Sequence, residues 1–198
     1  MNLLSIETAT KNPSTSLFRN EEIIYTYMNR DSVPQATDIP SKISEMKEIH
    51  SNLFNELDVV AVSIGPGSFT GIRVGLSLAK GIAFAMNLPI IPVNTLHAIQ
   101  MEIDDNSDHV IAMLSHSSFI YNMEVIDGIC GECILSDFHE INNSNLYAMN
   151  VDGLLKDSDY YKVSLSSEDI GKYALIHKKE LLERELNNIS PIYLTEFH

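Results

Sequence analysis

Short apolar runs alternate with turn residues over the start of the chain. Runs at 3–7, 14–18 and 23–28 are separated by Asn-Pro and Asn-Glu-Glu, a pattern that predicts three adjacent antiparallel strands. The next apolar residues recur at spacings of three and four, and this period predicts a helix over about 38–52. They are Ile39, Ile43, Met46, Ile49 and Leu53.

The segment that follows alternates between strand and helix patterns. An unbroken apolar run at 59–64 predicts a strand covered on both faces. After a glycine turn, a helical pattern extends over about 69–86, and a short strand at 89–93 leads into a helix at about 96–103. This order of elements predicts a mixed sheet with helices packed on it, in an α/β fold.

The second half of the sequence begins like the first. Apolar runs at 110–114, 119–125 and 129–135 predict another three-stranded meander, and a helical pattern appears at about 168–186. The acidic stretch Asp104–Asp108 separates the halves. We therefore predict two similar subdomains. The first is 1–103, joined by the C-terminal helix, and the second is a smaller, acidic 104–198.

Charge is distributed unevenly along the chain. It carries 13 Lys and Arg against 27 Asp and Glu, a net charge of −14. Residues 1–99 have 7 basic and 9 acidic side chains, residues 100–198 have 6 and 18, and no Lys or Arg lies between Lys80 and Lys156. Because phosphate backbones are bound by a surplus of basic side chains, this composition argues against a protein that binds nucleic acid alone.

The sequence shows no pattern typical of export or membrane insertion. The start, MNLLSIETAT, lacks a basic segment and soon becomes polar. The apolar stretch 74–96 is interrupted by Lys80 and by two prolines. Two cysteines are too few for a disulfide-rich secreted scaffold. We therefore predict a soluble cytoplasmic protein with no membrane partner.

Motifs for metals and nucleophiles are weak. Cys130 and Cys133 form a C-x-x-C, but the apolar residues around them predict a strand, whereas a redox pair needs a helix N-terminus; we predict two free thiols. The seven histidines form no H-x-x-x-H or H-E-x-x-H pair, and no G-x-S-x-G occurs. The sequence thus predicts neither a metal site nor a catalytic residue.

The segment from Ser63 to Leu76 predicts a strand, a glycine turn and a helix start, which together can bind an anion. The alternative is a tight turn with a well-capped helix. A carboxylate at the end of the first strand could hold a metal–phosphate complex, or it could lie on the surface. The residues that would lie near a phosphate are Glu7, Thr8, Gly65, Gly67, Ser68 and Thr70.

Two stripes follow the helix at about 69–86. One consists of small residues every four positions, Gly71, Gly75, Ala79 and Ala83, which would let another backbone approach closely. Glycine in a helix interior costs roughly 1 kcal/mol relative to alanine, so the close approach should offset that cost. The other stripe consists of Arg73, Ser77, Lys80 and Phe84. It is too polar for a core, so this helix has one face open to solvent or to a partner.

These residues also resemble those of a known family. The segment 65–81, GPGSFTGIRVGLSLAKG, is similar to the signature of the TsaB (YeaZ) proteins. Ile6–Thr10, Ile39-Pro40 and Pro191–Leu194 agree with that family in the same order. The absence of an H-x-x-x-H iron site and the short length favour TsaB over its relative TsaD. The family usually has Asp where this chain has Glu7.

The resemblance implies an ASKHA fold with two RNase H-like subdomains. It also implies a non-catalytic scaffold for forming N6-threonylcarbamoyladenosine beside the anticodon of tRNAs that read codons starting with A. The implied partners are TsaD, the catalytic subunit, and TsaE, an ATPase. tRNA would be contacted only through the complex, and a homodimer is expected in isolation. No cofactor of its own is implied, although ATP or ADP would lie at the complex interface.

We predict that the helix beginning at Ser68 and the helix over about 38–52 form the partner surface, with Gly75 turned toward the partner. The alternative, packing of the glycine stripe on the protein's own sheet, stays open. The predicted interface residues are Ile39, Ile43, Met46, Gly71, Ile72, Arg73, Gly75, Leu76, Ala79 and Lys80.

Two other functions compete with the scaffold. An ASKHA-type small-molecule kinase needs a second phosphate loop, but the glycines of the second half are scattered. A glycoprotease-like peptidase lacks support from any nucleophile or metal motif.

Overall fold

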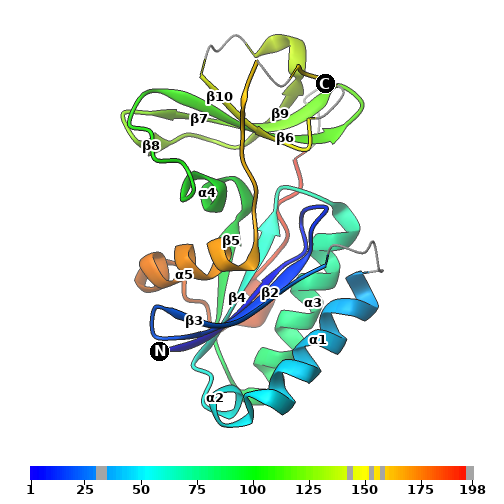
Figure 1. Cartoon of the computed structure of the whole chain (residues 1–198), viewed down its shortest axis with the longest axis vertical. Helices are drawn as coiled ribbons and strands as arrows, with labels where there is room; N and C mark the ends of the chain where they lie inside the picture. The colour runs from blue at the N-terminus through cyan, green and yellow to red at the C-terminus, as the bar shows by residue number, and fades with distance from the viewer. Residues whose placement is uncertain (30–34, 142–144, 152–153, 157–158, 195–198) are drawn as a thin grey trace.

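The computed structural model describes residues 1–29, 35–141, 145–151, 154–156 and 159–194. It consists of two sheets, each belonging to one half of the chain, with the longer helices packed around the first sheet (Figure 1). The strands of the first sheet run in the order β3-β2-β1-β4-β5. They are β1 (Asn2–Glu7), β2 (Ser14–Arg19), β3 (Glu22–Met28), β4 (Val59–Gly65) and β5 (Ile90–Asn94).

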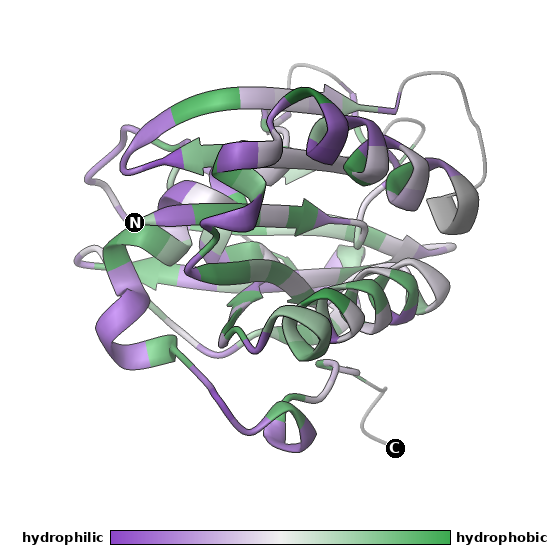
Figure 2. Ribbon diagram, turned by 90° about the horizontal axis from the view of Figure 1, so that it is seen from below, coloured by the Kyte–Doolittle hydropathy of each residue, from purple (hydrophilic) through white to green (hydrophobic). Residues whose placement is uncertain are grey.

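Helices cover both faces of the first sheet. α1 (Gln35–Ile49), α2 (Ser51–Asn55) and α3 (Phe69–Met86) lie over the face on which Leu4 and Val60 are buried. α4 (Thr95–Gln100) and α5 (Ser167–Leu181) lie over the opposite face, with Leu3 and Ala61. Figure 2 shows the hydrophobic residues concentrated on the strands between these helices. The strong apolar runs of β1 and β4 follow from this two-sided burial.

The second sheet repeats the topology of the first. Its order is β11-β10-β6-β7-β8, with β9 also pairing with β7. In both sheets the first two strands are antiparallel, and a later strand, β4 in the first sheet and β10 in the second, lies parallel to the first. The strands are β6 (His109–His116), β7 (Phe119–Ile126), β8 (Ile129–Cys130), β9 (Ile134–Asp137), β10 (Leu146–Met149) and β11 (Tyr161–Lys162).

The predicted fold class, α/β with two similar subdomains of the ASKHA type, is therefore confirmed. The second half is less regular than the first. Between β9 and β10, the position that α1 occupies between β3 and β4 in the first half, the only helix in the described residues is the short 3₁₀ helix η1 (Phe138–Glu140). The division into folding units at residue 104 stays a prediction, since α5 from the second half packs on β1 and β5 of the first sheet.

Three element predictions are wrong in detail. The strand predicted over 129–135 is split into β8 and β9, and the helix predicted over 38–52 begins earlier and is split into α1 and α2. The terminal helix ends at Leu181 rather than near residue 186. The chain leaves α5 there because Glu183 pairs with Ile90 at the free edge of β5, and the short 3₁₀ helix η2 (Leu186–Asn188) follows.

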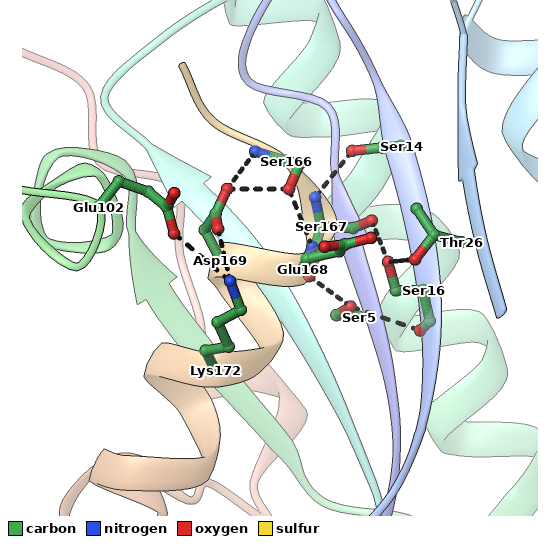
Figure 3. Close-up of polar contacts among 10 residues, drawn as sticks. All are labelled: Ser5, Ser14, Ser16, Thr26, Glu102, Ser166, Ser167, Glu168, Asp169 and Lys172. Carbon is green, nitrogen blue, oxygen red and sulfur yellow. Dashed lines mark hydrogen bonds and ion pairs between the residues drawn. The ribbon is translucent and has the colours of Figure 1, made fainter. Parts of the chain in front are cut away.

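Buried hydroxyl groups fix the start of α5 to the first sheet (Figure 3). The Ser167 amide donates to Ser14 Oγ at 2.8 Å, and Ser5 Oγ donates to the Ser167 carbonyl at 2.6 Å. Ser167 Oγ lies 2.7 Å from Ser16 Oγ. Asp169 accepts from both the amide and the hydroxyl of Ser166, which completes a capping box. The helix that ends the second half is thus bonded to strands that begin the first.

Replacing Ser167 by alanine should lower the free energy of unfolding by about 1 kcal/mol, because the buried hydroxyl of Ser16 loses one partner. Replacing the exposed Ser77 by alanine on α3 is the control and should leave stability unchanged or slightly higher. Chemical denaturation of both variants measures the difference. Equal stabilities would show that these buried hydroxyls do not hold α5.

Candidate functional site

The glycine turn before α3 is fastened to the turn that follows β1. The Ser68 amide donates to the Ala9 carbonyl at 2.8 Å, and a Cβ at Gly67 would collide with the same carbonyl. Ser68 Oγ accepts from the Gly71 amide at 3.2 Å and caps the helix. The N-terminal end of α3 is thereby held in one position against the end of β1.

A cleft of about 390 Å³ opens beside this helix end, between the two sheets. Lys11 is the basic side chain on its wall, and the second sheet contributes Ser115 and Tyr121. Because a helix N-terminus and a lysine both favour anions, the cleft suits a small anionic ligand. Its lining residues are Ala9, Thr10, Lys11, Gly67, Ser68, Phe69, Met113, Leu114, Ser115, Tyr121 and Asn150.

Glu7 does not reach this cleft, so both interpretations of it as a metal–phosphate ligand and as a surface residue are wrong. Its side chain is fully buried. One carboxylate oxygen accepts from the amides of Ala9 and Thr10 at 2.6 and 3.0 Å, and the other accepts from Thr10 Oγ1 at 2.8 Å. Burial raises the pKa of Glu7 to about 7, against the lowering effect of these hydrogen bonds. Glu7 therefore stabilises the turn after β1 through hydrogen bonds made in the protein interior.

Of the other residues predicted near a phosphate, Gly67 and Ser68 line the cleft and three do not. Thr8 is buried, and its hydroxyl donates to the Gly71 carbonyl at 2.7 Å. Gly65 has a φ of +105° and leaves no room for a Cβ beside the Ile192 carbonyl. Thr70 is exposed on α3. Lys11, which follows Thr10 directly, also lines the cleft, although no sequence pattern indicated it.

Most of the predicted interface residues lie in the protein's own core. Ile39, Met46 and Ile72 are fully buried. The apolar period that predicted the α1 and α3 helices marks the faces that pack on the sheet, and these faces are closed to a partner. The residues to be removed from the predicted interface are Ile39, Ile43, Met46, Gly71, Ile72, Gly75, Leu76 and Ala79.

Gly75 faces its own subdomain rather than a partner. A Cβ at this position would collide with the hydroxyl of Thr8. The stripe of small residues therefore lets α3 approach the end of β1 closely, which is the structural alternative that the sequence left open. The expectation that Gly75 meets a partner helix is wrong.

Part of the second stripe of α3 stays open. Ser77 and Gly81 are exposed, a Cβ at Gly81 would meet no atom within 4 Å, and Phe84 is 82% exposed. The C-terminal segment covers one flank of this face, where Lys80 Nζ donates to the Ile189 carbonyl at 2.8 Å. At the other end, Arg73 Nε donates to Tyr193 Oη at 2.7 Å. Nothing in the sequence pattern indicated these contacts.

Two further features lie outside this cleft. Phe69–Met86 is long and apolar enough to cross a membrane by length and composition alone, but its inner face packs on β4 as that of a core helix does. Cys130 and Cys133 are free thiols, and burial raises the pKa of both. Within the described ranges, no three His, Cys, Asp or Glu residues lie close enough to hold a metal ion.

Comparison with known proteins adds independent information. Residues 37–176 match the family model described as TsaD, tRNA N6-adenosine threonylcarbamoyltransferase. The TsaB threonylcarbamoyladenosine biosynthesis protein of Haemophilus influenzae is 33% identical over 147 residues, which cover 71% of this chain and 58% of the relative. The YeaZ structure from Pseudomonas aeruginosa superimposes with a TM-score of 0.77 at 18% identity and covers 98% of this chain and 99% of that one.

A relative named as the transferase itself also matches. The tRNA N6-adenosine threonylcarbamoyltransferase of Prosthecochloris aestuarii is 29% identical over 126 residues, covering 54% of this chain and 36% of the relative. The chain thus spans 58% of the length of the Haemophilus relative and 36% of the length of the Prosthecochloris relative.

Proposed function

This chain belongs to the TsaB (YeaZ) family, within the group of proteins that the TsaD model describes, and on that premise we propose that it is a non-catalytic subunit in the formation of N6-threonylcarbamoyladenosine in tRNA. The observation that carries the proposal is the open face of α3. The helix that bears the family signature buries one stripe in the core and leaves Ser77, Gly81 and Phe84 uncovered.

A non-catalytic role agrees with the chemistry of the site. The carboxylate at the end of β1 is buried and bonded to its own turn, so it is not available to a metal or a substrate. The cleft offers one lysine and a helix end, which suffice to bind an anion but provide no pair of acid and base. We therefore assign the transfer of the threonylcarbamoyl group to a partner.

The proposed partners are a TsaD homologue on the open face of α3 and a TsaE-type ATPase that joins the pair, in the cytoplasm. Phe84 is an exposed apolar side chain, and Gly81, one turn before it, has no side chain. A partner helix could therefore pack closely against this face. With a net charge of −14 the chain repels a phosphate backbone, so tRNA would be contacted through other subunits.

We propose that ATP or ADP binds at the interface of the complex and not to this chain alone. The residues of the cleft could hold a phosphate through Lys11 and the start of α3, but Glu7 is turned away from it. We therefore derive no ATP chemistry from this chain. Turnover of ATP by the purified chain alone would favour the competing kinase function.

Phe84→Asp is expected to weaken association with the TsaD homologue at least about tenfold, because it replaces the exposed aromatic side chain of the proposed interface with a charge. The control is Ile176→Asp on α5, which is 62% exposed on the other side of the first sheet. Co-elution of purified partners measures the effect, with thermal melting to show that both variants fold. Equal co-elution of the two variants would contradict the assignment of this face.

A further inference from the structure

The outer face of the second sheet, which points away from the first subdomain, is only partly covered. Its inner residues, such as Met123 and Val125, join the core shared with α4 and α5. On the outer face, Val110 and Ile120 are buried beneath Phe138 and neighbouring loop residues. In the first sheet the corresponding face is covered by α1 and α3, whereas here no helix of the described residues covers the end formed by β7, β8 and β9 (Figure 1).

Strand register places three isoleucines on this uncovered end. Ile126 pairs directly with Ile129, and Asn122 pairs with Ile134. Paired residues share a face of a sheet, and alternate residues of β7 share that same face. Ile126, Ile129 and Ile134, which we call the isoleucine patch, therefore share the outer face, with Ile134 opposite Asn122, four residues along β7 from the Ile126–Ile129 pair, and Glu124 between them.

All three isoleucines are exposed, and two of them flank the tight turn between β7 and β8. Ile126 is 53% exposed, Ile129 73% and Ile134 43%. Asp127 and Gly128 have φ values of +51° and +74°, which form the tight turn that an Asp-Gly pair favours between two strands. The Asp127 amide donates to Asp108 at 3.0 Å and fixes the turn. Exposed isoleucines on one face of neighbouring paired strands are the kind of apolar surface that marks an interaction site.

The charge around the patch is of one sign. Glu124, Asp127 and Glu132 are exposed beside the isoleucines, and no Lys or Arg occurs in the sequence between Lys80 and Lys156. A second copy of this chain would bring an equally acidic face against it and be repelled. A partner with basic side chains beside an apolar stripe would be attracted and steered to the patch.

We infer that the isoleucine patch binds a segment of another protein that presents an apolar stripe flanked by Lys and Arg. The patch lies on the subdomain opposite α3, so this inference is independent of the proposed partner surface. The isoleucines would supply the buried contacts, and Glu124 would pair with a basic residue at their centre.

Two synthetic amphipathic helical peptides serve as probes. Both carry the same leucine stripe, one flanked by Lys and the other by Glu, and each is titrated into the full chain at low and at higher salt. The lysine peptide should bind at least about tenfold more tightly than the glutamate peptide, with the difference reduced by salt. In the variant Ile126→Ser/Ile129→Ser, binding of the lysine peptide should fall at least about tenfold.

Two controls keep the inference testable. Ile176→Ser on α5, also highly exposed, should not change binding. Glu124→Lys leaves the isoleucines in place and should reduce the preference for the lysine peptide. Equal binding of the two peptides, no binding of either, or the same loss in Ile176→Ser would overturn the inference. A dimer of the chain that disappears in the double variant would overturn it too, in favour of a second copy.

Discussion

Replacing Gly75 by leucine is expected to lower the free energy of unfolding of the isolated chain by about 1–3 kcal/mol. A Cβ at Gly75 collides with the Thr8 hydroxyl, which itself donates to the Gly71 carbonyl at 2.7 Å. The larger side chain must push α3 away from the end of β1 and break that hydrogen bond. Thermal melting should show a drop of several degrees in Tm.

Gly81→Leu in the same helix is the matched control. Gly81 faces open space, so leucine replaces glycine without a clash and should raise stability by up to about 1 kcal/mol through its better helix propensity. The same variant should weaken association with the TsaD homologue if the open face of α3 is the interface. Similar melting of both variants would contradict the assignment of the two stripes.

Replacing Glu7 by glutamine should flatten the pH dependence of stability. The pKa of Glu7 is raised from 4.5 to about 7 in the folded chain. Between these values the unfolded chain has released the proton and the folded chain still holds it, so the free energy of unfolding falls as pH rises. Above about pH 7 the loss is complete and amounts to about 3 kcal/mol. Glutamine mimics the protonated acid and avoids this loss.

Melting of wild type and Glu7→Gln at pH 5 to 8, about the range of the titration, tests this. Wild type should lose stability toward the higher pH while the variant changes less, so that the variant is the more stable protein above pH 7. The control is the exposed Glu48→Gln on α1, which should follow wild type. Parallel curves of Tm against pH for wild type and Glu7→Gln would show that ionisation of the buried carboxylate does not lower the stability of the fold.

The sequence predicted the regular elements well because they bury continuous faces. The extent of α3, Phe69–Met86, matches its prediction, and the two meanders fall where the apolar runs lie. Periodicity reports which residues are buried but not against what. Eight of the α1 and α3 residues were therefore wrongly assigned to a partner interface, because the surface that they form packs in the protein's own core.

Contacts between distant parts of the chain could not be predicted. Nothing in a local pattern places the Ile189 carbonyl on Lys80 or Tyr193 on Arg73. Likewise, a carboxylate that ends an apolar strand is compatible with a ligand site, a surface residue or a buried turn, and only the hydrogen bonds of Glu7 to Ala9 and Thr10 distinguish them. Sequence patterns specify elements, whereas these sites depend on how the elements meet.

The most direct test of the central claim is the formation of N6-threonylcarbamoyladenosine in a reconstituted reaction. TsaD and TsaE homologues, substrate tRNA and the threonylcarbamoyl adenylate would be combined with and without this chain. We expect product only when the chain is present, normal yield with Ile176→Asp and a loss of at least about tenfold with Phe84→Asp at limiting concentration. An equal yield without the chain would contradict the account.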